Sequence, residues 1–158
     1  TQRHVFTCSM ADLFGAWVPQ EWINAVFAAE RGGPEWTFIH LTKNPHRMIE
    51  QDWPANAWAG TTVDVQARVA PAEEAFADVD APVRFLSCEP MLEALEFADL
   101  SMFDWVIIGG QSATDNCPAF QPEREWVDAL VRQARQFGCK VYEKPNLDVR
   151  LREYPGSE

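Results

Sequence analysis

The chain has 158 residues and a formal net charge of -11, with 47% hydrophobic residues as in an ordinary globular protein. This length supports one domain with its own core, but it is shorter than the roughly 250 residues of a complete eight-stranded α/β barrel. The acidic balance argues against direct nucleic-acid binding, which relies on clustered Lys and Arg. No apolar run approaches the roughly 18 residues that span a bilayer. We therefore expect a cytoplasmic protein that does not bind membranes.

Six short apolar runs recur along the chain, and each one ends at small or polar residues. Continuous apolar runs of this length are typical of strands that are buried on both faces, as in parallel sheets. The runs are VFTCS (5–9), WTFIHLTK (36–43), AWAGTTVD (57–64), VRFLSCEP (83–90), WVIIGGQS (105–112) and KVYEKP (140–145).

Two segments between these runs have the periodicity of helices. The first begins after Pro19, stops at Gly32, and predicts an inward face made of Trp22, Ala25, Val26 and Ala29. The second ends at Gly138 and predicts an inward face made of Trp126, Val127, Leu130, Val131, Ala134 and Phe137. Shorter helices are expected from Pro45 to about Gln51 and from Pro71 to about Asp78, and residues 91–104 are expected to form a loop with a short strand.

Strands separated by helical segments require right-handed crossovers and a parallel sheet. We therefore predict a single α/β domain over residues 1–158, a partial TIM-like (β/α) barrel with about six parallel strands. The chain starts at Thr1, and the first strand begins within four residues of it, so we expect an N-terminal truncation that removes the first strand unit. Such a sheet has an open edge, which favours a homodimer. The polar tail after Pro145 is expected to wrap the surface or to point to a neighbouring subunit.

The carboxyl ends of parallel strands meet at one edge of the sheet, where binding sites form. The polar and small residues that follow the six runs are Ser9, Asp12, Lys43, Thr61, Thr62, Asp64, Glu89, Gly109, Gly110, Gln111, Ser112, Glu143 and Lys144. Neighbouring lysines and carboxylates can act as general acids and bases, and a desolvated lysine can form a Schiff base. Lys43, Glu89 and Lys144 are therefore the catalytic candidates. The alternative is structural, because these three charges can neutralise one another across the barrel mouth.

Other motifs carry less information. Gly109-Gly110 allows a ligand to approach the backbone, but the rest of a dinucleotide fingerprint is missing. The three histidines have no metal-ligand spacing with any cysteine, so no metal site is predicted. The four cysteines are widely spaced, which favours reduced, buried thiols, and Cys88 has no histidine placed in the sequence to act as its base.

Six ordered segments resemble one known family over nearly the whole chain: CSMADLFGAWVP, HLTKNPHRM, WAGTTVDVQAR, VRFLSCEPML, DWVIIGGQS and KVYEKPNL with LREYP. This is a phage-associated family of unknown function, of the phage-protein or three-Cys-motif partner type, and a relative of the radical S-adenosylmethionine partial barrels. Those barrels bind a [4Fe–4S] cluster through three cysteines near their amino terminus. The resemblance implies that the cluster loop would lie upstream of Val5, and this chain has no such cysteine motif.

The resemblance also implies positions for the cofactor S-adenosylmethionine. Residues from Ser9 to Asp12 would lie near its methionyl amino group, Thr62 and Asp64 near its ribose, and residues from Gly109 to Gln111 near its adenine. The family often has Glu where this chain has Gln111 and Asn where it has Val65, so the contacts expected there differ.

Three functions follow from these observations. The first is a barrel that binds S-adenosylmethionine and cleaves it reductively if the full gene encodes the upstream cysteines. The second is a binding or accessory barrel that has no cluster and no catalytic activity, and that is a partner of another phage or defence protein. A small molecule is the ligand expected at the strand ends. The third is a lyase or aldolase that uses Lys43 or Lys144 as a Schiff-base amine.

Overall fold

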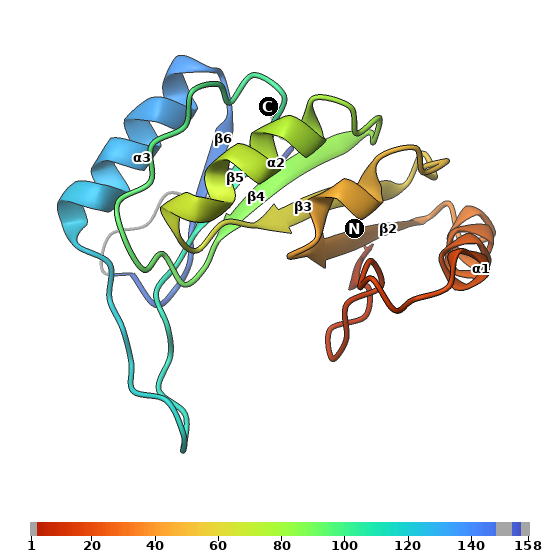
Figure 1. Ribbon diagram of the computed structural model, residues 1–158, viewed down its shortest axis with the longest axis horizontal. Coiled ribbons are helices and arrows are strands. Elements are labelled where there is room, and N and C mark those ends of the chain that lie inside the picture. Colours follow the sequence, from red (N-terminus) through yellow and green to blue (C-terminus); the bar gives the residue numbers. More distant parts are fainter. Residues whose placement is uncertain (1–2, 148–152, 156–158) are drawn as a thin grey trace.

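The computed structural model describes residues 3–147 and 153–155. One sheet contains six parallel strands that pair in chain order, β1-β2-β3-β4-β5-β6 (Figure 1). The strands are β1 (Arg3–Phe6), β2 (Trp36–Thr42), β3 (Ala57–Thr62), β4 (Val83–Cys88), β5 (Trp105–Ile108) and β6 (Lys140–Glu143). The helices are α1 (Gln20–Arg31), α2 (Val69–Phe76) and α3 (Arg124–Gln136), with 3-10 turns η1 (Pro45–Met48) and η2 (Gln66–Arg68).

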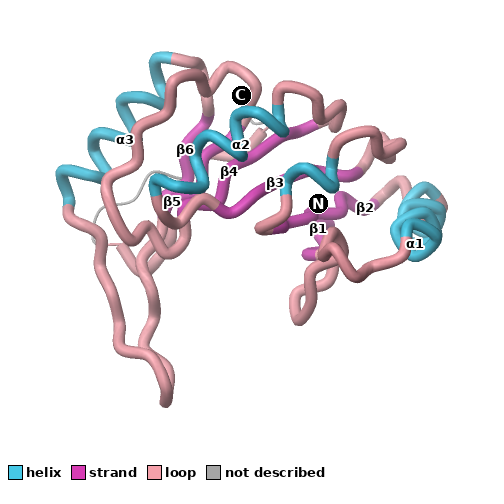
Figure 2. The backbone as a smooth tube through the Cα atoms, viewed as in Figure 1, coloured by secondary structure: helices cyan, strands magenta, loops and turns pink. Residues whose placement is uncertain are grey.

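The sheet curls into a half-barrel, with α2 and α3 on its convex side (Figure 2). The predicted partial α/β barrel with six parallel strands is therefore confirmed. The main core lies between the convex face and the helices, where every side chain in the following set is buried: Leu86, Val106, Ile108, Val141, Val69, Ala72, Phe76, Val127, Leu130 and Ala134. β1 forms one edge of the sheet, and the expected homodimer through that edge stays a prediction.

The buried face of α1 differs from the predicted one. Ile23, Phe27 and Glu30 are buried, whereas Trp22 is 61% exposed. Apolar residues surround much of this helix, so two faces about 100° apart satisfy the helical period almost equally well. The predicted face contains Trp22, whereas the protein buries the face that contains Glu30. For α3 the predicted face is largely correct, although Phe137 is 38% exposed.

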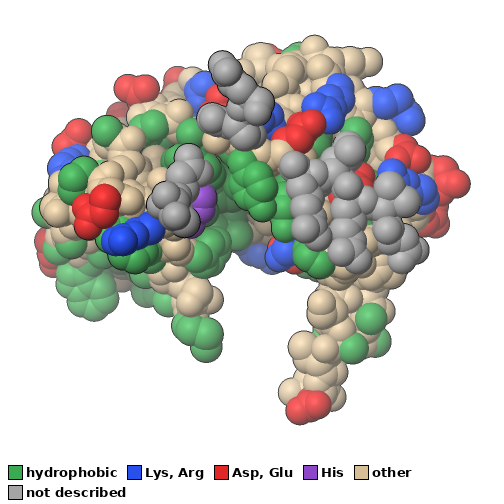
Figure 3. All heavy atoms as spheres, turned by 180° about the vertical axis from the view of Figure 1, so that it is seen from behind, with side chains coloured by type: hydrophobic (Ala, Val, Ile, Leu, Met, Phe, Trp, Pro, Cys, Tyr) green, Lys and Arg blue, Asp and Glu red, His purple; other side chains and the backbone are tan. Residues whose placement is uncertain are grey.

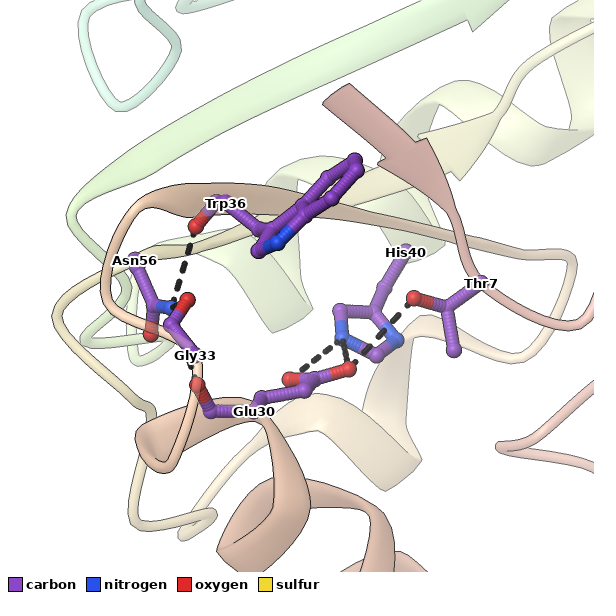
Figure 4. Close-up of polar contacts among 6 residues, drawn as sticks. All are labelled: Thr7, Glu30, Gly33, Trp36, His40 and Asn56. Carbon is purple, nitrogen blue, oxygen red and sulfur yellow. Dashed lines mark hydrogen bonds and ion pairs between the residues drawn. The ribbon is translucent and has the colours of Figure 1, made fainter. Parts of the chain in front are cut away.

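Glu30 is buried because its carboxylate has polar partners on the neighbouring strands (Figure 4). The His40 Nε2 atom lies 3.0 Å from Glu30 Oε1 and 3.1 Å from Oε2, and the Thr7 hydroxyl donates to Oε1 over 3.4 Å. Phe14 and Phe27 pack against the His40 ring. This cluster ties α1 to the end of β1 and to β2 inside an otherwise apolar region.

Asn56 secures the turn that leads out of α1. Its Nδ2 atom lies 3.0 Å from the carbonyl oxygens of Glu30, Gly33 and Trp36 (Figure 4). One amide on the segment before β3 thus lies beside three carbonyl oxygens, and its two N–H groups connect that segment to the turn between α1 and β2.

Smaller differences concern the connections. η1 stops at Met48, earlier than the predicted Gln51, and α2 begins at Val69, two residues before the predicted Pro71. Residues 91–104 form a loop without the expected short strand. The tail prediction falls partly on residues 148–152 and 156–158, which lie outside the described residues.

We predict that Gly60→Ala destabilises the sheet. A Cβ atom at Gly60 would lie within 2.4 Å of three atoms of the Phe85 ring, which is 1% exposed, so the ring would have to move. Overpacking of this kind costs about 1–3 kcal/mol of unfolding free energy. Urea denaturation of the two proteins measures this cost.

Gly33→Ala is the matched control, because its added Cβ atom would meet its nearest neighbour at an ordinary 3.5 Å. Replacing Phe85 by Leu in the Gly60→Ala protein is expected to recover part of the loss. Equal stability of the Gly60→Ala and Gly33→Ala proteins would contradict the close packing of Phe85 over β3.

Candidate functional site

The concave side of the half-barrel contains a cavity of about 380 Å³, which we call the lumen. Figure 3 shows this side as a hollow in which hydrophobic side chains gather. Side chains point alternately to the two faces of a strand, so every second residue of β4, β5 and β6 reaches the lumen. These residues are Phe85, Ser87, Glu89, Trp105, Ile107, Tyr142 and Lys144, and β1 and β2 add Phe6, Ile39 and Leu41. The volume lies in the range of small-molecule sites.

Aromatic rings form the floor of the lumen. The Trp105 ring lies 5.9 Å from that of Trp58, 6.1 Å from that of Tyr142 and 5.6 Å from that of Tyr154. These centroid distances are typical of favourable aromatic pairs. The amino ends of the strands are therefore packed, and the polar part of the lumen lies at the carboxyl ends.

An ion pair between Glu89 and Lys144 stands at the carboxyl end of the lumen. The Lys144 Nζ atom lies 2.6 Å from Glu89 Oε1 and 2.7 Å from Oε2. Glu89 follows β4 and Lys144 follows β6, so the pair crosses the end of β5 at Gly109. A Cβ atom at Gly109 would lie 3.2 Å from both Glu89 Cγ and Lys144 Cδ. Because Gly109 has no side chain, Glu89 and Lys144 have the space to form their ion pair beside it.

A second charged cluster follows β2 and β3. The Lys43 Nζ atom lies 2.8 Å from Asp64 Oδ2, and the Arg68 Nε atom lies 2.7 Å from Asp64 Oδ1. Burial by itself would raise the pKa of Asp64, but the hydrogen bond and charge of Lys43 and the charge of Arg68 outweigh it. The pKa of Asp64 is therefore lowered, and this carboxyl is ionised at neutral pH.

The two lysines predicted as catalytic belong to separate ion pairs. Lys43 contacts Asp64 and Lys144 contacts Glu89, so Lys43, Glu89 and Lys144 do not form one network across the mouth. Only Glu89 and Lys144 of these three line the lumen. The sheet thus places the predicted residues along one edge, as expected, but divides them between two clusters.

The predicted cofactor-binding residues are distributed along the same edge. Asp12 Oδ2 accepts a hydrogen bond from the Thr42 hydroxyl over 2.7 Å, and Ser9 is exposed on the loop after β1. Gly110 contacts the side-chain amide of Asn146 through its N–H and its carbonyl. The Gln111 amide donates to the Pro118 carbonyl over 2.7 Å. Gln111 thereby stabilises residues 111–120, a hairpin-like projection after β5 that we call the β5 arm (Figure 2).

Sequence reasoning missed Arg68 and the aromatic floor. Arg68 lies beyond the end of β3, and only its spacing of four residues from Asp64 hinted at a contact. Trp105 and Tyr142 lie inside apolar runs. The sequence of such a run does not indicate which face of the strand lines a cavity. The segment KVYEKP did indicate the position of Tyr142. Tyr142 and Lys144 are two residues apart, so their side chains must lie on the same face of β6.

The cysteines divide into two groups. Burial raises the pKa of the Cys88 thiol far above its usual range and raises that of Cys139 to about 11, so both are inert, as expected for buried thiols. Cys8 and Cys117 are exposed, which contradicts the prediction that the thiols are buried. Among the described residues, no group of three or more His, Cys, Asp or Glu side chains could hold a metal ion. No helix in the same part of the chain is long and apolar enough to cross a bilayer.

Residues 1–145 match the model of a family described as a protein of unknown function, DUF5131. No curated protein and no solved structure matches the chain. The description of this family names no activity.

We predict that the contribution of Asp64 to stability depends on pH. The pKa of Asp64 is lower in the folded protein than the ordinary value of about 3.9, so its contribution is complete above that value. This contribution is lost as the pH falls through the folded pKa. In urea denaturation between pH 7 and pH 3, the wild-type protein should lose its advantage over Asp64→Asn below about pH 4.

Asp115→Asn, in the exposed part of the β5 arm, is the matched control for this pH series of urea denaturation. A stability difference between wild type and Asp64→Asn that stays constant down to pH 3 would show that Lys43 and Arg68 do not stabilise the ionised carboxylate.

Proposed function

The chain belongs to this family of unknown function, DUF5131, and we propose that it binds a small molecule in the lumen of its half-barrel. The observation that carries the proposal is the combination of an apolar, aromatic cavity with one ion pair at its carboxyl end. Ligand sites are mostly apolar, with a few polar groups that fix the orientation of the ligand.

The lining indicates the chemistry of the ligand. Ile107, Leu41 and the aromatic rings favour a flat, weakly polar group in the body of the lumen. Lys144 and Glu89 together complement a zwitterion, because the ammonium can pair with a ligand carboxylate while the carboxylate pairs with a ligand ammonium. An amino acid attached to an aromatic ring system combines both features.

S-adenosylmethionine is our candidate, because it carries an adenine at one end and an amino acid at the other. In this proposal the adenine occupies the apolar lumen, and the methionyl group lies at Lys144 and Glu89. This placement differs from the one that the resemblance implies, with the methionyl group near Ser9 to Asp12 and the adenine near Gly109 to Gln111. The resemblance to radical S-adenosylmethionine barrels and to phage proteins supports the choice. When bound, this cofactor supplies an activated methyl group or, with an electron donor, a carbon radical.

The residues of this chain serve the binding part of that chemistry. Lys144 and Glu89 orient the amino acid, and Phe85 and Trp105 exclude water from the ring. No three of the four cysteines come together within the described residues, so these cysteines do not form a site for an iron–sulfur cluster. A cluster would require cysteines upstream of Val5, and without them the same lumen serves a binding protein that has no cluster.

Isothermal titration calorimetry tests the proposal with S-adenosylmethionine, adenosine and methionine. We expect saturable binding of S-adenosylmethionine and weaker binding of each fragment. Lys144→Gln and Glu89→Gln should each weaken binding about tenfold, as expected for the loss of a charge-assisted hydrogen bond. The control is Arg31→Gln, which removes an exposed cation paired with Asp52, and neither residue lines the lumen.

Absence of saturable binding of all three ligands to the wild-type protein would sink the S-adenosylmethionine proposal. Binding that Lys144→Gln and Arg31→Gln weaken to the same extent would place the ligand outside the lumen.

A second function is favoured by one observation, the position of an amine beside a carboxylate in an apolar cavity. Lys144 could condense with a carbonyl compound, with loss of water, while Glu89 accepts and returns protons. Lys43 does not line the lumen, so Lys144 is the better candidate. Borohydride reduction in the presence of pyruvate should then give a stable adduct at Lys144, detected by mass spectrometry. No adduct, or an equal yield with Lys144→Gln, would exclude this amine.

A further inference from the structure

A second pocket, of about 250 Å³, lies between the loops that follow β2 and β3. Lys43 and His46 line it from the first loop, Thr62 lines it from the end of β3, and Arg68 lines it from η2. None of its lining residues belongs to the lining of the lumen. The pocket is therefore a separate place on the same edge of the sheet.

This pocket is cationic, although the chain as a whole has a net charge of -11. Lys43 and Arg68 approach the two oxygens of one carboxylate, Asp64, so two positive charges face one negative charge. Arg68 uses its Nε atom for this contact, and its terminal nitrogens make no hydrogen bond to the described residues. The fork of the guanidinium group is thus available to another anion.

We propose that this pocket binds a phosphate group through Lys43, Arg68 and His46. Phosphate suits the arrangement because its oxygens can accept from an ammonium and from a guanidinium fork at the same time. Asp64 holds the two cations in place, and its own negative charge lowers the affinity of the pocket for phosphate. The proposal goes beyond the ligand of the lumen and does not depend on it.

Titration of the ¹⁵N-labelled protein with inorganic phosphate tests the proposal by NMR. We expect saturable shifts of the amide signals of Thr62 and Arg68. Lys43→Ala and Arg68→Ala should each weaken phosphate binding about tenfold, because each removes a charge-assisted hydrogen bond. Asp64→Asn should strengthen it several-fold, because it removes the competing negative charge. A purely structural ion-pair cluster would not show this gain.

Arg31→Ala is the matched control, since it removes an exposed cation from another ion pair and should leave the affinity for phosphate unchanged. Ribose 5-phosphate, compared with ribose, identifies the source of the group. Tighter binding of the ester than of inorganic phosphate indicates a phosphorylated metabolite, and equal binding indicates free phosphate.

Shifts that do not saturate would overturn the proposal. It would also be overturned if Arg31→Ala and Arg68→Ala weakened phosphate binding equally. The circular dichroism spectrum of each variant verifies its fold, and Lys43, which is 54% exposed, is the substitution least able to disturb it. Loss of phosphate binding leaves the proposed lumen ligand untouched, because the two pockets share no lining residue.

Discussion

The pairing of six parallel strands in chain order is the constraint on which the structure depends. Each crossover returns the chain to the same end of the sheet, so all six carboxyl ends lie along one edge. Right-handed crossovers place the connecting segments on the convex side. No helix of the described residues lies on the concave side of the half-barrel, and the lumen forms there.

Side-chain alternation along the strands determines which residues face the lumen. Phe85, Ser87 and Glu89 point to the concave side of β4, whereas Leu86 and Cys88 pack on the convex side. The same period brings Lys144 over Gly109 to meet Glu89. The residues of the strands and the positions directly after them therefore suffice to form an apolar cavity that ends in one ion pair. The loops that follow β2 and β3 form a separate cationic pocket on the same edge of the sheet.

The sequence predicted the strands, the main helices and the edge that carries the polar residues. It could not predict the buried face of α1, because the decision rests on the Glu30 to His40 contact between residues ten positions apart. It also could not predict that the charged residues at the carboxyl ends of the strands form two separate clusters. Lys43 and Lys144 look alike in sequence, yet only the distances between strands decide that one pairs with Asp64 and the other with Glu89.

The sequence by itself determined the class of fold, since six apolar runs with helical segments between them can only be buried as a parallel sheet. It also determined that Ser9, Lys43, Asp64, Glu89 and Lys144 follow the strands at one edge. The tertiary structure alone decided which of these charges face a cavity, because the curl of the sheet gives its two faces different surroundings. Local periodicity describes one strand at a time, whereas a lumen is a property of six strands together.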